Sequence, residues 1–282
     1  MNTDIIPGSI VVGADGSDAA DRAIHWAAEQ AWLERRHLTV VTAADHYLDG
    51  SRGIVNVALA MVARMRPGVE ADGCVVVGDP REVLVELSPR AHLLVLGSRG
   101  HGPVRSKLLG SVSAAVSRDA TCPVVVCRPH HWRSAKDIDA GVLVGADGTA
   151  ESLPVIEHAF QQASLRGLPL TVVHCTWDGV VALTGPAVLD PQAVGMEEER
   201  LLLAESVAGF TAKFPEVHVE LQVARGLAEQ VLAAGSARWD LVVVGRHPVD
   251  TFARRAMGAV STSVVEHAHT SVAVVPQAVA VH

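Results

Sequence analysis

The stretch IVVGADGS at residues 10–17 recurs as VLVGADGT at residues 142–149, which is a shift of 132 residues. The same shift aligns LTVVTA at residues 38–43 with LTVVHC at residues 170–175. Two later pairs of segments match at a shift of 148 residues: LLVLG with LVVVG (93–97, 241–245) and GSVSAAVSRDATCPVVV with GAVSTSVVEHAHTSVAV (110–126, 258–274). Four matches in the same order indicate one domain that is present twice.

The two shifts differ by 16 residues, so the second copy carries an insertion, which we place around residues 177–199. The segment RPHHWRSAKDIDAG is polar and lacks apolar periodicity, as is typical of a linker. We therefore expect a first domain over residues 1–130, a linker over residues 131–140 and a second domain over residues 141–282.

Each copy alternates short apolar runs with longer amphipathic stretches, which predicts an α/β fold. The clearest helical pattern covers residues 18–35, and its apolar face comprises Ala23, Trp26, Ala27, Ala31 and Trp32. The apolar runs are continuous, as in parallel strands that helices cover on both faces. In the first copy they are residues 10–14, 38–43, 73–77, 93–97 and 123–127. Right-handed crossovers make this a doubly wound sheet, whose ligands bind beyond the carboxyl ends of the strands.

The composition excludes several classes of protein. Apolar residues make up 49% of the 282 residues and charged residues 19%, so we expect a packed core. A net charge of −8 and an aromatic share of 4% argue against nucleic-acid binding. No apolar run reaches the ~18 residues of a membrane span, and no secretory signal precedes the four cysteines, which form no C-x-x-C pair. We expect a cytoplasmic protein with no membrane or nucleic-acid partner.

The first strand is followed by a short polar turn, in which Asp15 is the candidate binding residue. Ser17 is a candidate N-cap for the next helix, with Asp18 and Asp21 in the first turn. The Asp15 carboxylate can accept a hydrogen bond from a ribose hydroxyl or an adenine amine. It can equally stabilise the turn by binding nearby amides. The sequence leaves both roles open.

The fourth strand is followed by the glycine-rich stretch GSRGHGPVRSKLLGSVS at residues 97–113, which lacks the Walker A spacing. Gly97 and Gly100 can take a positive φ and allow close approach of a ligand. Gly110 and Ser111 open the next helix, whose free amides attract anions. The loop is also rich in side-chain donors: Arg99, His101, Arg105 and Lys107. These features favour an anion site over an ordinary surface loop.

The combination of V-G-x-D-G-S with G-x-x-G-x9-G-S resembles the universal stress protein family in its tandem-domain form. The resemblance implies two tandem doubly wound domains, each with a five-stranded parallel sheet of order 3-2-1-4-5. It also implies that the chain binds ATP, to which Mg²⁺ can be attached, and that it acts with an unidentified protein partner. The implied role is a stress-response or growth-regulating sensor, as a monomer of two domains or a homodimer.

The resemblance also implies where ATP lies. The implied ATP-binding residues of the first domain are Gly13, Ala14, Asp15, Ala43, Leu96, Gly97, Arg99, Gly100, His101, Gly110, Ser111, Val112 and Ser113. The corresponding residues of the second domain are Gly145, Asp147, Cys175, Gly245, Arg246, Gly258, Val260 and Ser261.

The second glycine loop departs from the pattern, because Pro248 replaces a glycine and Ala259 replaces a serine. Proline lacks an amide donor and alanine lacks a hydroxyl. Each lost hydrogen bond costs about 0.5–1.5 kcal/mol, so we expect the second site to be about tenfold to a hundredfold weaker.

No catalytic residues are expected, and at most a weak ATPase activity, because Arg99 and His101 are equally explained as phosphate ligands. The fourteen histidines form no metal-binding motif, so we expect no metal site in the protein itself. One alternative is an enzyme of a related adenine-nucleotide α/β family with slow ATP hydrolysis or nucleotidyl transfer, although its S-G-G-x-D-S and H-x-G-H motifs are missing. A flavin carrier and, for the second half, a scaffold without ligand are further alternatives.

Overall fold

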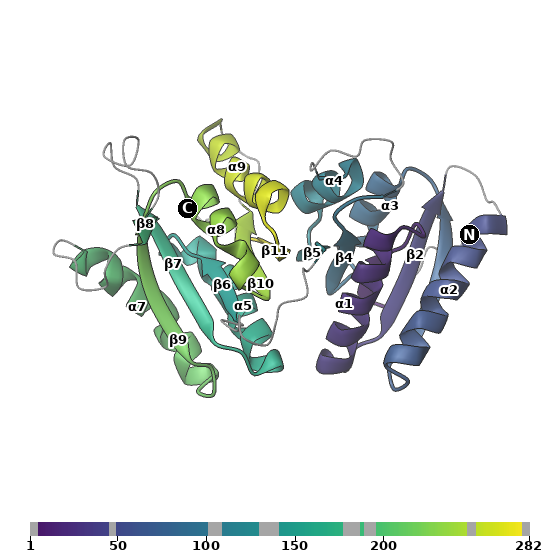
Figure 1. Cartoon of the computed structure of the whole chain (residues 1–282), viewed down its shortest axis with the longest axis horizontal. Helices are drawn as coiled ribbons and strands as arrows, with labels where there is room; N and C mark the ends of the chain where they lie inside the picture. The colour runs from purple at the N-terminus through teal and green to yellow at the C-terminus, as the bar shows by residue number, and fades with distance from the viewer. Residues whose placement is uncertain are drawn as a thin grey trace. The chain divides into compact units, whose positions relative to one another are not determined.

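The computed structural model describes residues 5–44, 49–100, 109–129, 141–176, 187–188, 196–246 and 252–277. The chain divides into two compact units, Met1–Pro129 (unit 1) and His130–His282 (unit 2). The division falls within the polar segment that separates the two sequence copies. In each unit, parallel strands form a sheet that has helices on both faces (Figure 1).

Unit 1 has the predicted sheet, with neighbouring strands parallel and in the order β3-β2-β1-β4-β5. Its strands are β1 (Ile10–Gly13), β2 (Leu38–Ala44), β3 (Ala71–Val77), β4 (Leu93–Gly97) and β5 (Val124–Cys127). Its helices are α1 (Asp18–Glu34), α2 (Asp49–Met65), α3 (Pro80–Leu87) and α4 (Ser111–Asp119). Helices α1 and α2 pack side by side on one face of the sheet, and α3 packs against α4 (Figure 1).

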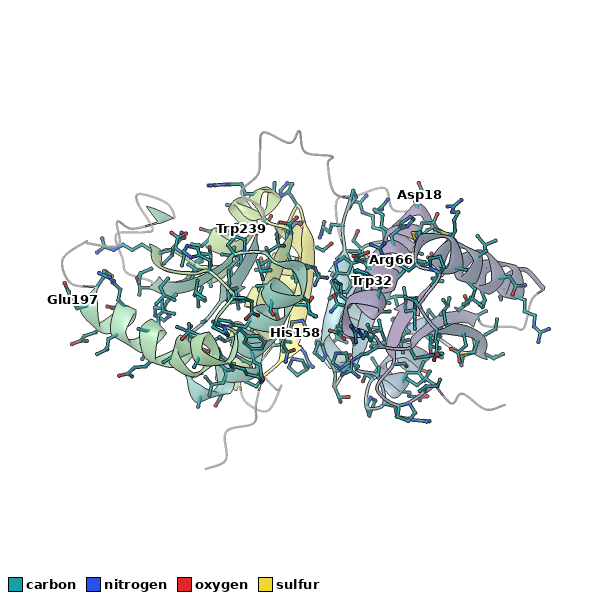
Figure 2. The ribbon with its side chains drawn as sticks, turned by 90° about the horizontal axis from the view of Figure 1, so that it is seen from below. Asp18, Trp32, Arg66, His158, Glu197 and Trp239 are labelled. Carbon is teal, nitrogen blue, oxygen red and sulfur yellow. The ribbon has the colours of Figure 1, made fainter. Side chains whose placement is uncertain are left out.

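The core of unit 1 follows from its apolar strands, since Val11, Leu94 and Val95 are fully buried between the helical layers. One prediction for α1 is wrong. Trp32, assigned to the apolar face, is 51% exposed. The Arg66 guanidinium lies over its ring, 4.8 Å from the ring centroid, and the two side chains lie together in Figure 2. This contact lets a large aromatic ring remain at the surface.

Unit 2 repeats the parallel arrangement in the order β9-β7-β6-β10-β11. These strands are β6 (Val142–Gly145), β7 (Leu170–Thr176), β9 (Val219–Arg225), β10 (Leu241–Arg246) and β11 (Ser271–Pro276). The helices are η1 (Ala150–Ser152), α5 (Leu153–Arg166), α7 (Glu197–Lys213), α8 (Ala228–Ala234), η2 (Ser236–Arg238) and α9 (Phe252–His267).

Unit 2 also has a strand that the sequence did not predict. The short strand β8 (Ala187–Val188) pairs antiparallel with the end of β9. It belongs to the segment between the end of β7 and the start of α7, which is where the inserted residues lie. The insertion therefore adds an edge strand and leaves the five parallel strands in place.

No helix in the described ranges is both long and apolar enough to span a bilayer.

Candidate functional site

The turn after β1 places Asp15 at the carboxyl end of the sheet. The Ala14 amide donates to the Val41 carbonyl over 2.9 Å, which anchors the turn to β2. One carboxylate oxygen of Asp15, Oδ1, accepts from the Ser17 amide over 3.0 Å. The Ser17 hydroxyl accepts from the Ala20 amide over 3.2 Å, so the predicted N-cap is confirmed.

The second oxygen of Asp15 lies against the glycine loop. A methyl group placed on Gly100 would overlap Oδ2 of Asp15, and both residues are exposed. The turn after β1 and the loop after β4 therefore meet at one point. Asp15 stabilises its own turn through Oδ1 and presents Oδ2 beside the loop, so the two roles considered for it are compatible.

The two ends of the glycine loop, at Ser98 and Gly110, lie next to each other. The Ser98 amide donates to the Cys127 carbonyl over 3.0 Å, and the Gly110 amide donates to the Ser98 carbonyl over 2.9 Å. A methyl group on Gly110 would lie only 3.3 Å from Cα of Arg99. These contacts bring the exposed Arg99 next to the start of α4.

Gly97 is required for a reason other than the predicted one. Neither Gly97 nor Gly100 has a positive φ, so that expectation is wrong. A methyl group on Gly97 would instead lie 2.5 Å from the carbonyl carbon and oxygen of Ala19, in the first turn of α1. The helix therefore crosses the end of β4 at a distance that only glycine allows.

The start of α4 supplies backbone amides that the helix itself leaves without an acceptor. Gly110 is its N-cap and provides no side-chain cap, so Ser111 is the first helical residue. The amides of the first turn have no intrahelical acceptor, and the helix dipole favours an anion there. The Ser113 hydroxyl donates to the Gly97 carbonyl over 2.6 Å, and its side chain is buried. Ser113 thus joins α4 to β4.

Three further residues predicted for the site, Gly13, Leu96 and Ala43, lie at or near the carboxyl ends of β1, β4 and β2. Strand β2 pairs Val41 with Gly13, so Ala43 stands beyond the end of β1 at the level of Asp15. Leu96 is buried, and its Cδ2 atom would lie 2.7 Å from a methyl group on Gly13. His101, Arg105 and Lys107 lie outside the described residues.

The corresponding turn of unit 2 has different hydrogen bonds. Oδ1 of Asp147 accepts from the Thr149 amide over 2.9 Å and from the Thr149 hydroxyl over 2.7 Å. Thr149 makes no side-chain cap, and a 3-10 turn follows before α5 begins. The hydroxyl that could cap a helix is instead directed to the carboxylate.

At the end of β7, two side chains differ from those of unit 1. His174, aligned with Thr42, bonds the Ala146 carbonyl over 3.0 Å through Nδ1, which must carry the proton because a carbonyl only accepts. Thr42 makes the matching bond to Ala14, a similarity detectable only by aligning the two copies. Burial, together with the nearby Glu229 carboxylate, raises the pKa of Cys175 to about 11.

The phosphate side of unit 2 departs further from the prediction. Gly245 and Arg246 are the last two residues of β10. Gly258, the counterpart of Gly110, lies inside α9, as do Val260 and Ser261, because that helix begins at Phe252. Amides within a helix bond the carbonyl four residues earlier and are no longer free. Pro248 lies outside the described residues.

Within the described residues, no group of three or more His, Cys, Asp or Glu side chains could hold a metal ion.

The chain belongs to the universal stress protein family, because the model of that family matches it twice, over residues 8–128 and 141–276. A universal stress protein of Mycobacterium tuberculosis is 34% identical over 290 residues, covering 95% of this chain and 97% of its own. A universal stress protein of Mycolicibacterium smegmatis is 32% identical over 289 residues, and this match covers 94% of this chain and 96% of that protein.

Among solved structures, a universal stress protein from Archaeoglobus fulgidus superposes with a TM-score of 0.69 at 19% identity. The match covers 95% of this chain and 96% of that one. This likeness shows the same tandem fold, and the family assignment rests on the sequence matches.

Proposed function

We propose that unit 1 binds ATP and that the protein acts as a nucleotide-dependent regulator in the cytoplasm. The observation that carries the proposal is the contact between the Asp15 carboxylate and Gly100. This contact joins a hydrogen-bond acceptor for a nucleoside to a glycine loop suited to phosphates, at the end of the sheet where doubly wound folds bind ligands.

The nucleoside and the phosphates of ATP would bind to different halves of the site. Oδ2 of Asp15 would accept from a ribose hydroxyl or an adenine amine, beside Ala43 on the neighbouring strand. The first amides of α4 and the Arg99 guanidinium would receive the phosphates. Mg²⁺ would be held chiefly by the phosphates themselves, as is usual for this ion.

The proposed role is to hold ATP and present a nucleotide-dependent surface to a protein partner. Fast hydrolysis needs a group that positions water and groups that stabilise the developing charge. In the described part of the site, the Asp15 carboxylate already accepts a hydrogen bond from the Ser17 amide through Oδ1. Retention of the nucleotide therefore agrees better with this geometry than rapid turnover.

The first experiment is to purify the full chain, extract bound nucleotide and identify it by mass. Calorimetry with ATP then compares the parent chain with Gly100→Ala. We expect the variant to bind at least about tenfold more weakly, because its methyl group displaces the Asp15 carboxylate and costs a hydrogen bond to a charged group. Gly68→Ala is the matched control, since a methyl group there meets nothing within 4 Å.

Equal ATP affinity in the parent and in Gly100→Ala would contradict the assigned site. A turnover near the ~10 s⁻¹ typical of enzymes would contradict the regulatory role while leaving the site in place.

A further inference from the structure

The turn that carries Asp15 is bound by a side chain of the neighbouring strand β2. We propose that Thr42 is a positioning residue of the nucleotide site, because its hydroxyl fixes the peptide group through which Asp15 is presented. The inference rests on the proposed function, since Asp15 is the residue that would bind the nucleoside. Thr42 is only 3% exposed, so it acts through Asp15 and does not touch the ligand.

The hydrogen bond involved lies just beyond the paired part of β1 and β2. The pairing of these two strands ends at Gly13 and Val41. The next carbonyl of the chain, that of Ala14, accepts from the Thr42 hydroxyl over 2.9 Å, and this bond is buried. Among the residues that the structure describes, Thr42 is the only hydrogen-bond donor to this carbonyl. The hydroxyl therefore satisfies a polar group that strand pairing leaves without a partner.

The Ala14 carbonyl belongs to the same planar peptide group as the Asp15 amide. This peptide is trans, so the N–H of Asp15 points in the opposite direction from the carbonyl and away from Thr42. Ala14 is also bound through its own amide, which donates to the Val41 carbonyl over 2.9 Å. Because both its amide and its carbonyl are bound to β2, Ala14 fixes the direction in which the chain enters the turn of Asp15.

Removal of the Thr42 hydroxyl would leave the Ala14 carbonyl without this partner in a buried position, since Ala14 is only 5% exposed. A buried unpaired carbonyl is costly, and a rotation of the peptide between Ala14 and Asp15 toward water would relieve the cost. The same rotation would move the Asp15 carboxylate relative to Gly100, against which its Oδ2 atom lies. The loss of one buried hydroxyl would therefore alter the geometry of the site.

Unit 2 makes the same bond with a different side chain. His174 aligns with Thr42 at the shift of 132 residues, and its Nδ1 atom bonds the Ala146 carbonyl over 3.0 Å. A hydroxyl and an imidazole differ in size and shape, and what they share here is the ability to donate a hydrogen bond. The two copies therefore indicate that the turn requires a donor at this position and not a particular side-chain shape.

The test compares ATP binding by the full-length parent with that of three variants of β2. Thr42→Val nearly keeps the shape of the side chain and removes the hydroxyl, whereas Thr42→Ser keeps the hydroxyl and removes a methyl group. Thr39→Val is the matched control, because Thr39 is equally buried and its hydroxyl has no hydrogen-bond partner among the described residues. Calorimetry measures the affinity and thermal unfolding the stability. The Gly100 amide, in NMR spectra of the ligand-free protein, reports the position of the Asp15 carboxylate.

We expect Thr42→Val to bind ATP about tenfold or more weakly and to shift the Gly100 amide resonance. Thr42→Ser and Thr39→Val should bind ATP as the parent does, with the Gly100 resonance unshifted. This should hold even though the loss of a buried methyl group makes Thr42→Ser less stable. A merely structural role for Thr42 predicts instead that the affinity follows the stability across the three variants.

Equal affinity in Thr42→Val and the parent, or an equal loss in Thr42→Val and Thr42→Ser, would overturn the inference and leave the proposed function intact. No ATP binding by the parent would contradict the proposed function. The Gly100 amide then decides the inference by itself. A shift in Thr42→Val that Thr42→Ser does not show supports the positioning role, and unchanged spectra overturn it.

Discussion

The two copies begin their first helices differently, although both carry the sequence V-G-A-D-G followed by a hydroxyl residue. In unit 1, Ser17 caps α1, which starts immediately at Asp18. In unit 2, the Ser152 amide donates to the Thr149 carbonyl over 3.1 Å, a 3-10 turn forms, and α5 starts only at Leu153.

This difference alters both halves of the strand-end site. Because α1 starts early, its first turn lies against Gly97. In unit 2, the Thr149 hydroxyl donates to Asp147, and the Gln277 side chain lies beside Gly245. A shared motif therefore specifies the turn, while the residues that follow it decide whether the turn can present its carboxylate to a ligand.

The largest expected difference is in the loss of stability when the aligned glycines near the ends of β4 and β10, Gly97 and Gly245, are each replaced by alanine. Gly97→Ala should lower the stability of unit 1 by about 3 kcal/mol, because its methyl group meets the backbone of Ala19, which cannot move aside. Gly245→Ala should cost under about 1 kcal/mol, because the Gln277 side chain can rotate away. Hydrogen exchange followed by mass spectrometry measures each unit separately. Equal losses in the two units would break the comparison.

The next effect concerns the two aspartates. Asp15→Asn should weaken ATP binding by about tenfold or more, since the neutral amide accepts a weaker hydrogen bond than a carboxylate. Asp147→Asn should leave the affinity for ATP unchanged. Oδ1 of Asp147 already accepts from the Thr149 hydroxyl, and the Leu202 side chain lies against Gly148 in the same turn. Calorimetry on the full chain measures both. A loss of affinity in Asp147→Asn would indicate that unit 2 contributes to binding.

A smaller effect should separate the two hydroxyl residues. Ser17→Ala removes a helix cap and should destabilise unit 1 by about 1 kcal/mol. Thr149→Ala removes no cap and should cost about 0.5 kcal/mol or less, the value of a weak exposed hydrogen bond. The same exchange measurement applies, and Ser17→Thr, which keeps the cap, is the control. A larger loss in Thr149→Ala would show that its bond to Asp147 stabilises unit 2.

The smallest effect is a pH dependence confined to unit 1. Burial raises the pKa of Glu34, but the hydrogen bond and charge of His92 and the Gln30 amide outweigh it, leaving the pKa below its ordinary 4.5. A lowered carboxyl pKa contributes stability above pH 4.5 that is lost as the pH falls through the folded-state value. In unit 2, the residue that aligns with Glu34 is Arg166, whose guanidinium donates a hydrogen bond to the Gln162 side chain.

Glu34→Gln should therefore flatten the loss of stability of unit 1 below pH 4.5 and leave unit 2 unchanged. Urea unfolding at several pH values, read by exchange in each unit, gives the two profiles. An unchanged acid profile of unit 1 would show that other carboxylates dominate it.

Much of the architecture was predictable because it depends on patterns that repeat along the chain. Continuous apolar runs identified the parallel strands, and the duplication identified the two units. The Ser17 cap was also predictable, because a hydroxyl one residue before a helix binds an amide three residues away. Trp32 was misplaced, because helical periodicity does not show that Arg66, which follows the end of α2, covers the exposed ring.

The sequence by itself determined the parallel α/β fold, its duplication and the family, because local hydrophobic patterns and motif spacing suffice for these properties. Only the tertiary structure decided that Asp15 meets Gly100, that Gly97 is required by the backbone of α1, and that Leu202 covers Gly148. Each of these contacts joins residues far apart in the sequence within a few ångströms. Such contacts depend on where a helix begins and how two elements cross, which no spacing along the chain records.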